Sequence, residues 1–154
     1  MKNIESILFV CTGNSCRSPM AEALAKEMFA NNIKVASAGT HVMPGMKASS
    51  GSIVAMQKID LDLSKHESQM LTEDLIDQYD LLICMTIGHK RHTLDLHPDA
   101  IGKVSVLTDF LGGESLGIDD PVGLSSEAYE ECAKQIQKCL QGFLKELLEE
   151  RQES

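Results

Sequence analysis

Four short apolar runs alternate with helical patterns along this 154-residue chain, and the alternation restricts the fold more than any other feature. The runs suited to buried strands lie at residues 4–10, 33–37, 80–85 and 103–107. The helical patterns lie at about residues 18–31, 48–58, 72–78, 87–96 and 125–150. Strands that alternate with helices form right-handed crossovers and a parallel sheet. We predict a single α/β domain over residues 1–154, a three-layer sandwich with a four-stranded parallel sheet and helices on both faces.

Two segments outside these patterns are predicted to be irregular. The stretch from Gly112 to Gly123 contains four glycines and a proline, which indicates a loop. Because it precedes the last helix, it is free to fold over the edge of the sheet where ligands bind in such folds. The polar tail from Glu149 to Ser154 is expected to be frayed.

The charge balance limits the partners that the chain is expected to have. The formal net charge is −9, from 14 basic and 23 acidic residues. An acidic protein lacks the electrostatic footprint for nucleic acid and repels anionic lipid. The sequence shows neither an export signal nor a run of membrane-spanning length. We therefore expect a cytoplasmic protein with no nucleic-acid and no membrane partner.

A cysteine-containing turn follows the first apolar run, and we call residues 11–18 the cysteine loop. Ile7 to Val10 are strand formers, and Ser18-Pro19 opens a segment of good helix formers. A tight turn between a strand and a helix N-terminus directs backbone N–H groups to one point, where they bind anions. Cys11 lies at the rim of this nest and Arg17 at its far end, so the anion site contains a nucleophile.

The other cysteines are expected to be structural. The chain has five cysteines, an odd number, and shows no export signal, which argues against a structural disulfide framework. Cys132 and Cys139 lie on the apolar side of the last helical pattern, and Cys84 lies inside an apolar run. Free cysteines of this kind are usually buried as small apolar groups. Cys11 and Cys16 differ because both lie in the glycine-containing turn.

The cysteine loop has the groups needed for displacement at phosphorus. Cysteine attacks as the thiolate, which a helix N-terminus and an arginine stabilise, and Ser18 can add a hydrogen bond. The Arg17 guanidinium can hold two oxygens of a phosphoryl group. The leaving group also needs a proton, and Asp120 in the glycine-rich loop is the candidate acid. The alternative is that Asp120 or Asp119 only caps a turn before Pro121.

The run from Cys11 to Ala23, together with Asp120-Pro121, resembles the low-molecular-weight protein tyrosine phosphatase family over nearly the whole chain. The resemblance implies that Cys11 forms a cysteinyl-phosphate, Arg17 binds phosphate, Ser18 stabilises the thiolate, and Asp120 is the general acid and then the general base. It implies no metal and no cofactor. The expected partner is a phosphorylated protein, and inorganic phosphate is the expected product.

Further positions match supporting residues of that family. Asn14 matches the residue that holds the unusual backbone of the loop, and Ser37 and His66 match its hydrogen-bond partners. Cys16 matches a neighbour that forms a reversible disulfide with the nucleophile and so limits over-oxidation. The remaining members of the phosphate-binding loop are Thr12, Gly13 and Ser15.

Two positions bear on the substrate. Val122 follows Asp-Pro where tyrosine-specific members carry tyrosine, and Ser15 replaces a larger apolar residue. A small hydroxyl residue at this position resembles bacterial relatives that act on phosphoarginine, and Asp119 beside Asp120 would favour a cationic substrate. We place phosphotyrosine first and phosphoarginine second, because activity on aryl phosphates follows from the chemistry of the loop.

Two other classes remain as alternatives. Thioredoxin-coupled arsenate reductases share the opening motif, but they need two further cysteines a few residues apart, and this chain has only Cys84 in that region. A non-enzymatic anion-binding or redox-sensing module would use Cys11 and Cys16 alone. His89 and His92 lie three residues apart on a predicted helix, and we assign them to a solvated face rather than to a metal site.

Overall fold

The computed structural model describes residues 4–30, 32–112 and 117–153 and contains a four-stranded sheet in the order β2-β1-β3-β4. All three strand pairs are parallel. The strands are β1 (Ser6–Cys11), β2 (Lys34–Gly39), β3 (Leu81–Cys84) and β4 (Val104–Val106). Each lies within two residues of a predicted run, and β2 continues past the predicted end at residue 37 because Ala38 and Gly39 pair with Val10 and Cys11.

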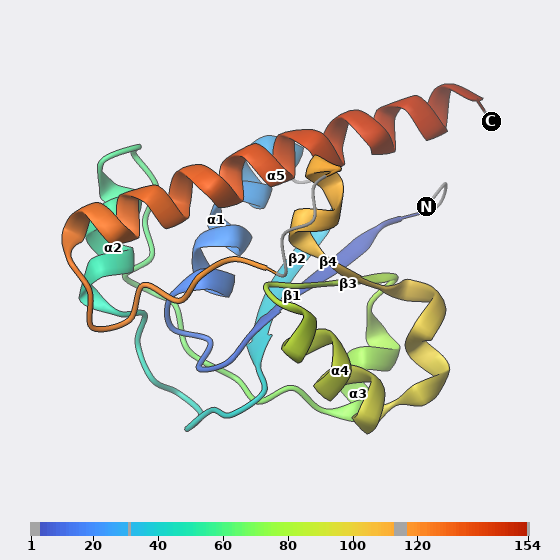
Figure 1. Ribbon diagram of the computed structural model, residues 1–154, viewed down its shortest axis with the longest axis horizontal. Helices are drawn as coiled ribbons and strands as arrows, with labels where there is room; N and C mark the ends of the chain where they lie inside the picture. Colours follow the sequence, from blue (N-terminus) through green and yellow to red (C-terminus); the bar gives the residue numbers. More distant parts are fainter. Residues whose placement is uncertain (1–3, 31, 113–116, 154) are drawn as a thin grey trace.

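The helices form two outer layers around this sheet. They are α1 (Arg17–Phe29), α2 (Ser50–Gln57), α3 (Glu73–Gln78), α4 (Ile87–Leu96) and α5 (Ser126–Glu153). Figure 1 shows α1 and α5 on one side of the strands and α3 and α4 on the other. The predicted three-layer α/β sandwich is confirmed. Two short 3-10 helices, Pro98–Lys103 and Leu107–Leu111, flank β4 and were not predicted, because single turns of this length have no periodic pattern.

Strand β1 is buried on both faces, as the central strand of a covered parallel sheet must be. Ile7 and Phe9 belong to the larger apolar cluster, with α1 and α5, whereas Leu8 and Val10 belong to the cluster on the opposite face. This alternation is the two-residue period of a strand. It fixes the register of β1 and therefore the position of Cys11 at its carboxyl end.

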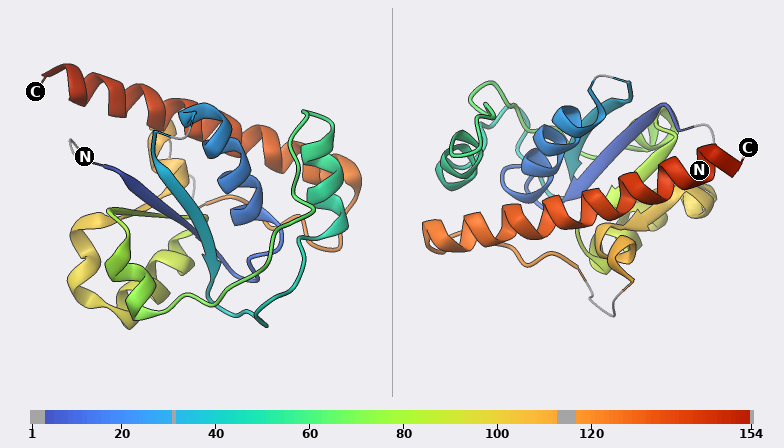
Figure 2. Two further views of the ribbon diagram at one scale, coloured as in Figure 1. Left: turned by 180° about the vertical axis from the view of Figure 1, so that it is seen from behind. Right: turned by 90° about the horizontal axis from the view of Figure 1, so that it is seen from above.

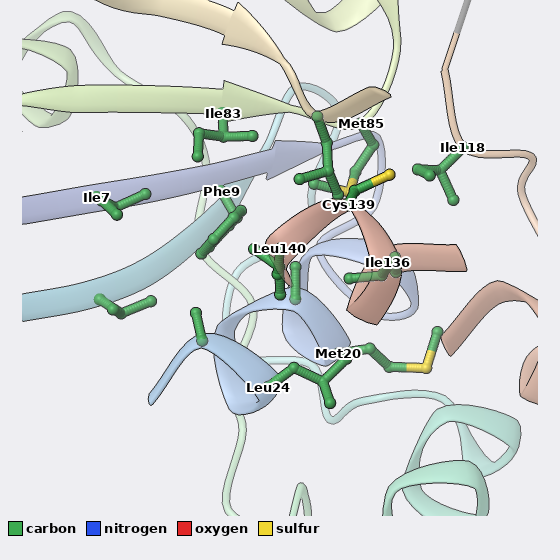
Figure 3. Close-up of a cluster of buried hydrophobic side chains, with 14 of the residues drawn as sticks. Ile7, Phe9, Met20, Leu24, Ile83, Met85, Ile118, Ile136, Cys139 and Leu140 are labelled. Atoms are coloured by element: carbon green, nitrogen blue, oxygen red, sulfur yellow. The ribbon is translucent and has the colours of Figure 1, made fainter. Parts of the chain in front are cut away.

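The larger core lies between the sheet and helices α1 and α5. Figure 3 shows side chains from the three elements gathered in one cluster, including Phe9, Met20 and Leu140. Helix α5 contributes one continuous apolar side, which was predicted from its spacing. Its buried side chains include Cys132, Ile136, Cys139, Leu140, Phe143 and Leu147. In the described part of the chain, no helix is long and apolar enough to cross a membrane.

The last helix extends beyond its predicted end at about residue 150, and the frayed tail stays a prediction. Helix α5 continues to Glu153, and Ser154 lies outside the described residues. The Arg151 Nη2 group donates a hydrogen bond of 3.1 Å to the carbonyl of Ile4. Figure 2 shows the end of α5 beside the start of β1, where this tertiary contact lies.

Candidate active site

The cysteine loop lies at the carboxyl edge of the sheet, where open parallel sheets bind ligands. Cys11 is the last residue of β1, and Arg17 is the first residue of α1. The chain crosses from β1 to β2 on one side and continues to β3 on the other side of β1, which makes this edge a topological switch point. Cys11 and Arg17 therefore meet at the place where the sequence predicted a ligand.

The backbone of the cysteine loop is tightly curled. Asn14 has a φ of 53°, in the left-handed region that asparagine tolerates better than most residues. A Cβ atom on Gly39 of β2 would lie 2.5 Å from the Thr12 carbonyl oxygen, so only glycine allows the loop to pack here. Within the described part of the chain, the backbone N–H groups from Gly13 to Ser18 donate to no protein acceptor. These unpaired donors make the loop an anion nest.

Arg17 is buried with one nitrogen left for a ligand. Its Nη1 donates to the carbonyl of Ile118 over 2.9 Å, and its Nη2 lies 3.4 Å from Thr12 Oγ1. The same Nη2 lies 3.4 Å from Asp120 Oδ2. The Nε atom is buried and has no hydrogen-bond partner among the described residues. A buried unpaired donor is costly, and an anion in the nest would satisfy it.

The Cys11 thiol is held by a directed chain of hydrogen bonds. Its Sγ lies 2.9 Å from Ser18 Oγ. Asn14 Nδ2 donates to the same Ser18 Oγ over 2.9 Å. Because Ser18 accepts from Asn14, its own hydroxyl hydrogen is available to donate to Cys11. This is the arrangement that stabilises a thiolate, and all three side chains are buried.

Asn14 is anchored from several elements. Its Nδ2 also donates to Ser37 Oγ of β2 over 2.9 Å, and the His66 Nε2 donates to its carbonyl oxygen over 2.7 Å. The structure thus brings the predicted residues Ser37 and His66 against Asn14. Two members of this network were missed. Ser37 donates to Glu22 over 2.6 Å, and the backbone N–H of Gln69 donates to Asn14 Oδ1 over 3.0 Å.

Asp120 lies in the segment of residues 117–123, which we call the acid loop. Ile118 fixes this loop, because its N–H donates to the Met85 carbonyl over 2.7 Å and its own carbonyl accepts from Arg17. Asp120 Oδ1 accepts from the N–H of Val122 over 3.1 Å, so the carboxylate caps a turn and also faces Arg17. The Asp120 side chain is 41% exposed. Residues 113–116 of the predicted loop lie outside the described residues.

The other cysteines have the environments of core residues, as predicted. Burial raises the pKa of Cys84 to about 12, that of Cys132 to about 12 and that of Cys139 to about 11. Thiols of this kind stay protonated and unreactive. Cys16 is also buried, and its Sγ donates to Ser49 Oγ over 3.2 Å. Cys11 and Cys16 are both free thiols, so their disulfide stays a prediction.

The assignment of His89 to a solvated face is wrong. His89 is 6% exposed, and its Nε2 lies 2.8 Å from Thr12 Oγ1 in the cysteine loop. The side chain turns inward because Thr86, at the start of α4, is an N-cap whose backbone N–H donates to His89 Nδ1. His92 is half-buried, with its ring 5.3 Å from that of His41. The Thr86-x-x-His89 spacing, typical of a capping box, was the available signal.

Comparisons with known proteins show the family of this chain. The chain belongs to the low molecular weight phosphotyrosine protein phosphatase family, whose model matches residues 6–153. It is 35% identical to a protein-arginine-phosphatase of Bacillus subtilis, over 94% of this chain and 98% of the relative. It is 33% identical to the low molecular weight protein-tyrosine-phosphatase Ptp of Acinetobacter johnsonii, over 93% and 98%.

Other relatives share the fold and differ in name. An arsenate reductase of Staphylococcus aureus is 32% identical over 90% of this chain and 95% of its own length. Among solved structures, Vibrio vulnificus Wzb in complex with benzylphosphonate superposes with a TM-score of 0.88 and 32% identity, covering 94% of this chain and 100% of that chain. Membership of the family is therefore established. Relatives of similar sequence identity are named as an arginine phosphatase, a tyrosine phosphatase and an arsenate reductase.

Proposed function

We propose that this protein is a cysteine-dependent protein phosphatase that hydrolyses phosphotyrosine and releases inorganic phosphate. One observation carries the proposal: a single short loop holds the Cys11 thiol, a buried Arg17 Nε without a partner among the described residues, and a run of unpaired backbone N–H groups. These donors match the oxygens of a phosphoryl group, and the thiol matches an attack on its phosphorus atom. The family supports a phosphorylated protein as the substrate.

In the first step, the Cys11 thiolate attacks the phosphorus atom in line with the leaving oxygen. The S–P bond forms as the P–O bond to the tyrosine side chain breaks. Asp120 donates its proton to the leaving phenolate oxygen, which makes a neutral phenol. Arg17 and the N–H groups of the loop neutralise the charge on the three other phosphoryl oxygens.

In the second step, water hydrolyses the cysteinyl-phosphate. Asp120, now a carboxylate, takes a proton from the attacking water, and the P–S bond breaks. Inorganic phosphate leaves, and Cys11 returns as a thiolate that accepts a hydrogen bond from Ser18. The exposure of Asp120 suits this double role, because the carboxyl group can meet both the leaving group and water.

Phosphoarginine is the second candidate, and the surroundings of Ser15 favour it. Ser15 is only half-buried in the loop, and its hydroxyl, which has a long contact of 3.7 Å to Cys16 Sγ, can bind a polar leaving group. Asp119 and Asp120 are both exposed beside the nest and would attract a guanidinium. Val122, which follows Asp120-Pro121, is 59% exposed and offers no aromatic ring to a phenyl group.

One experiment separates these two substrates. We would measure kcat/KM on matched phosphotyrosine and phosphoarginine peptides for the wild type and for Ser15→Ile. If the wild type prefers phosphotyrosine, the proposal stands. A preference for phosphoarginine that Ser15→Ile shifts toward phosphotyrosine would replace it with the second candidate. Ser50→Ala, an exposed serine at the start of α2, serves as the control and leaves the preference unchanged.

Arsenate reduction is less well supported, although one relative carries that name. Cys84, the cysteine nearest in sequence to the expected relay position, lies in the core of the sheet, 3.8 Å from Thr93 Oγ1. A thiol that is kept protonated by burial does not pass on a disulfide. Sustained arsenate-dependent oxidation of thioredoxin would overturn this conclusion.

We also propose that Cys16 protects Cys11 from over-oxidation by forming a disulfide with it. Cys16 is the N-cap of α1 and lies in the same loop as Cys11, and both are free thiols. After mild peroxide treatment, the wild type should regain activity with a dithiol. Cys16→Ser should lose activity irreversibly under the same conditions.

A further inference from the structure

The imidazole of His89 connects helix α4 to the cysteine loop. Its Nδ1 lies 3.1 Å from the backbone nitrogen of Thr86, and its Nε2 lies 2.8 Å from Thr12 Oγ1. The first contact completes the N-cap of α4. The second contact reaches a residue 77 positions away in the chain. One buried ring therefore serves a helix end and the rim of the anion nest.

The hydrogen bond at Nδ1 fixes the tautomer of the ring. A backbone N–H can only donate, so Nδ1 accepts from Thr86 and carries no proton. In a neutral imidazole, the proton is then on Nε2, which donates to Thr12 Oγ1. Thr12 Oγ1 also accepts from Arg17 Nη2 over 3.4 Å. With both lone pairs of its oxygen in use, the Thr12 hydroxyl becomes a fixed support for the Arg17 guanidinium.

We propose that His89 is a positioning residue that acts through the Thr12 hydroxyl to hold the Arg17 guanidinium ready for the phosphoryl oxygens. The inference rests on the proposed function, because it assigns His89 to the same phosphate site. Arg17 Nη1 donates to Ile118, and Nη2 contacts Thr12 and Asp120, so Nε is the guanidinium nitrogen that has no partner among the described residues. His89 fixes the only one of these supports that is a neutral side chain.

The surroundings of His89 keep its ring neutral. Burial is the largest cause of the low pKa of His89, which is about 4. Arg17 of α1, His92 of the same helix and His41 after β2 also lower this pKa, whereas Asp120 of the acid loop raises it. A neutral ring is what the geometry needs, because an imidazolium would lose the bond from Thr86 and repel Arg17.

Two substitutions of His89 separate the helix cap from the contact with Thr12. In His89→Asn, the side-chain oxygen can still accept from Thr86, but the side chain is too short to reach Thr12. In His89→Gln, the amide nitrogen takes the position of Nε2 and can donate to Thr12. We expect His89→Asn to weaken the binding of inorganic phosphate and to lower kcat/KM on p-nitrophenyl phosphate by about three- to tenfold each, and His89→Gln to recover most of both losses.

A double-mutant cycle tests whether His89 acts through Thr12. Thr12→Val removes the hydroxyl that receives the hydrogen bond, whereas Thr12→Ser keeps it. If the inference is right, His89→Asn has its full effect in Thr12→Ser and almost none in Thr12→Val. Thr72→Ala, which removes the N-cap of α3, is the control for a loss of helix capping. It should lower stability and leave both the binding of phosphate and kcat/KM unchanged.

A role in capping alone gives the opposite result. His89→Asn would then match the wild type, or its loss would be equally large with and without the Thr12 hydroxyl, and either outcome overturns the inference. Nitrogen NMR of the ring adds a measurement that does not depend on turnover. It should show the Nε2–H tautomer throughout about pH 5.5 to 8, and a proton on Nδ1 would also overturn the inference.

The failure of the proposed function has a different signature. If the wild type binds inorganic phosphate and does not hydrolyse p-nitrophenyl phosphate or phosphotyrosine peptides, the proposed function fails. The binding of phosphate by the His89 and Thr12 variants would then still decide the role of His89. If the wild type turns over and the His89 variants match it in binding and rate, only the inference fails.

Discussion

The cysteine loop and the acid loop meet at Arg17, and they are built in opposite ways. Asn14 and Ser18 are 0% exposed, and their hydrogen bonds extend to β2 and to the segment after α2. The Asp120 side chain is 41% exposed, and its contacts are the turn at Val122 and the guanidinium of Arg17. A buried hydrogen-bond network therefore fixes the cysteine loop, whereas the acid loop exposes its carboxyl group to solvent.

This difference in burial and hydrogen bonding matches the two catalytic roles that we propose for the loops. Groups that stabilise charge in a transition state work best when they are held in place beforehand and away from water. A group that gives a proton in one step and takes one in the next must reach water between the steps.

Removing the nucleophile should have the largest effect. Cys11→Ser should lower kcat on p-nitrophenyl phosphate by about 10⁴-fold or more, because a serine hydroxyl is a far weaker nucleophile than a thiolate. The binding of inorganic phosphate, measured by calorimetry, should remain, since Arg17 and the N–H groups are unchanged. Cys139→Ala in the core is the control and should keep its activity. Turnover by Cys11→Ser near the wild-type rate would refute the role of Cys11.

Removing the proton donor should have the next largest effect. We expect Asp120→Asn to lower kcat by about 10²- to 10⁴-fold on phenyl phosphate, a substrate with a poor leaving group, and by less on p-nitrophenyl phosphate. Asp95→Asn, an exposed carboxylate on α4, should match the wild type on both substrates. An equal loss on the two substrates would mean that Asp120 is not the general acid.

Two substitutions at Asn14 test the buried network. Asn14→Gly and Asn14→Ala both remove the amide, and each should lower kcat by about 10²-fold through a misplaced Ser18 and Cys11. Asn14→Ala should unfold more easily than Asn14→Gly by about 1 kcal/mol, because its φ of 53° is strained for alanine. Urea denaturation measures this difference.

The control for Asn14 is another residue with the same kind of backbone. Asp60 has a φ of 62° in the turn after α2, far from the cysteine loop in the chain. Asp60→Ala should carry the backbone strain and keep its kcat. If Asn14→Ala also kept its kcat, the buried network would have a structural role only. The proposed division of roles between the two loops would then be wrong.

We also predict a pH dependence of stability due to His89. Its pKa in the folded protein is lowered to about 4, below the unfolded value of about 6.5. The unfolded chain therefore takes up this proton first as the pH falls. The neutral His89 ring contributes fully to the free energy of unfolding above about pH 6.5. This contribution is lost as the pH falls toward 4, and the loss is about 2 kcal/mol at pH 4.5.

Comparison with His89→Gln isolates this contribution from that of the other titrating groups. The wild type should lose about 2 kcal/mol more than His89→Gln between pH 7 and pH 4.5 in urea denaturation. If the free energy of unfolding of the two proteins had the same dependence on pH, the ring would not be buried in its neutral form and the prediction would be wrong. The buried state of the ring is one of the features that tie α4 to the cysteine loop.

Local patterns predicted the fold and much of the site. The strands were found because buried β-strands have continuous apolar runs, and the cysteine loop was found because its residues are neighbours in the chain. Ser37 and His66 were placed against Asn14 only through a family resemblance, since nothing in their local sequence points to Asn14. Local structure can therefore be predicted from one sequence. A contact between segments that are distant in the chain can be predicted only from a related protein or seen in the structure.

The contacts that were missed or wrong are all tertiary. Glu22 lies on the exposed side of a helical pattern, and only the position of Ser37 makes it part of the network. His89 and His92 were assigned to a solvated helix face because no carboxylate or cysteine stands at a spacing that would complete a metal site with them. The capping contact with Thr86 is local, but the contact with Thr12 joins residues that are remote in sequence. Arg151 likewise contacts Ile4, which is remote in sequence.

The acid loop also has a consequence for how this protein can diversify. Val122 is 59% exposed and Leu124 is 63% exposed, while the buried Pro121 and Ile118 attach the loop to the body of the protein. Substitutions at exposed positions usually change stability by no more than about 0.5 kcal/mol. Evolution can therefore sample side chains beside the general acid without endangering the fold. The substrate preference of this chain can therefore change while its reaction centre stays intact.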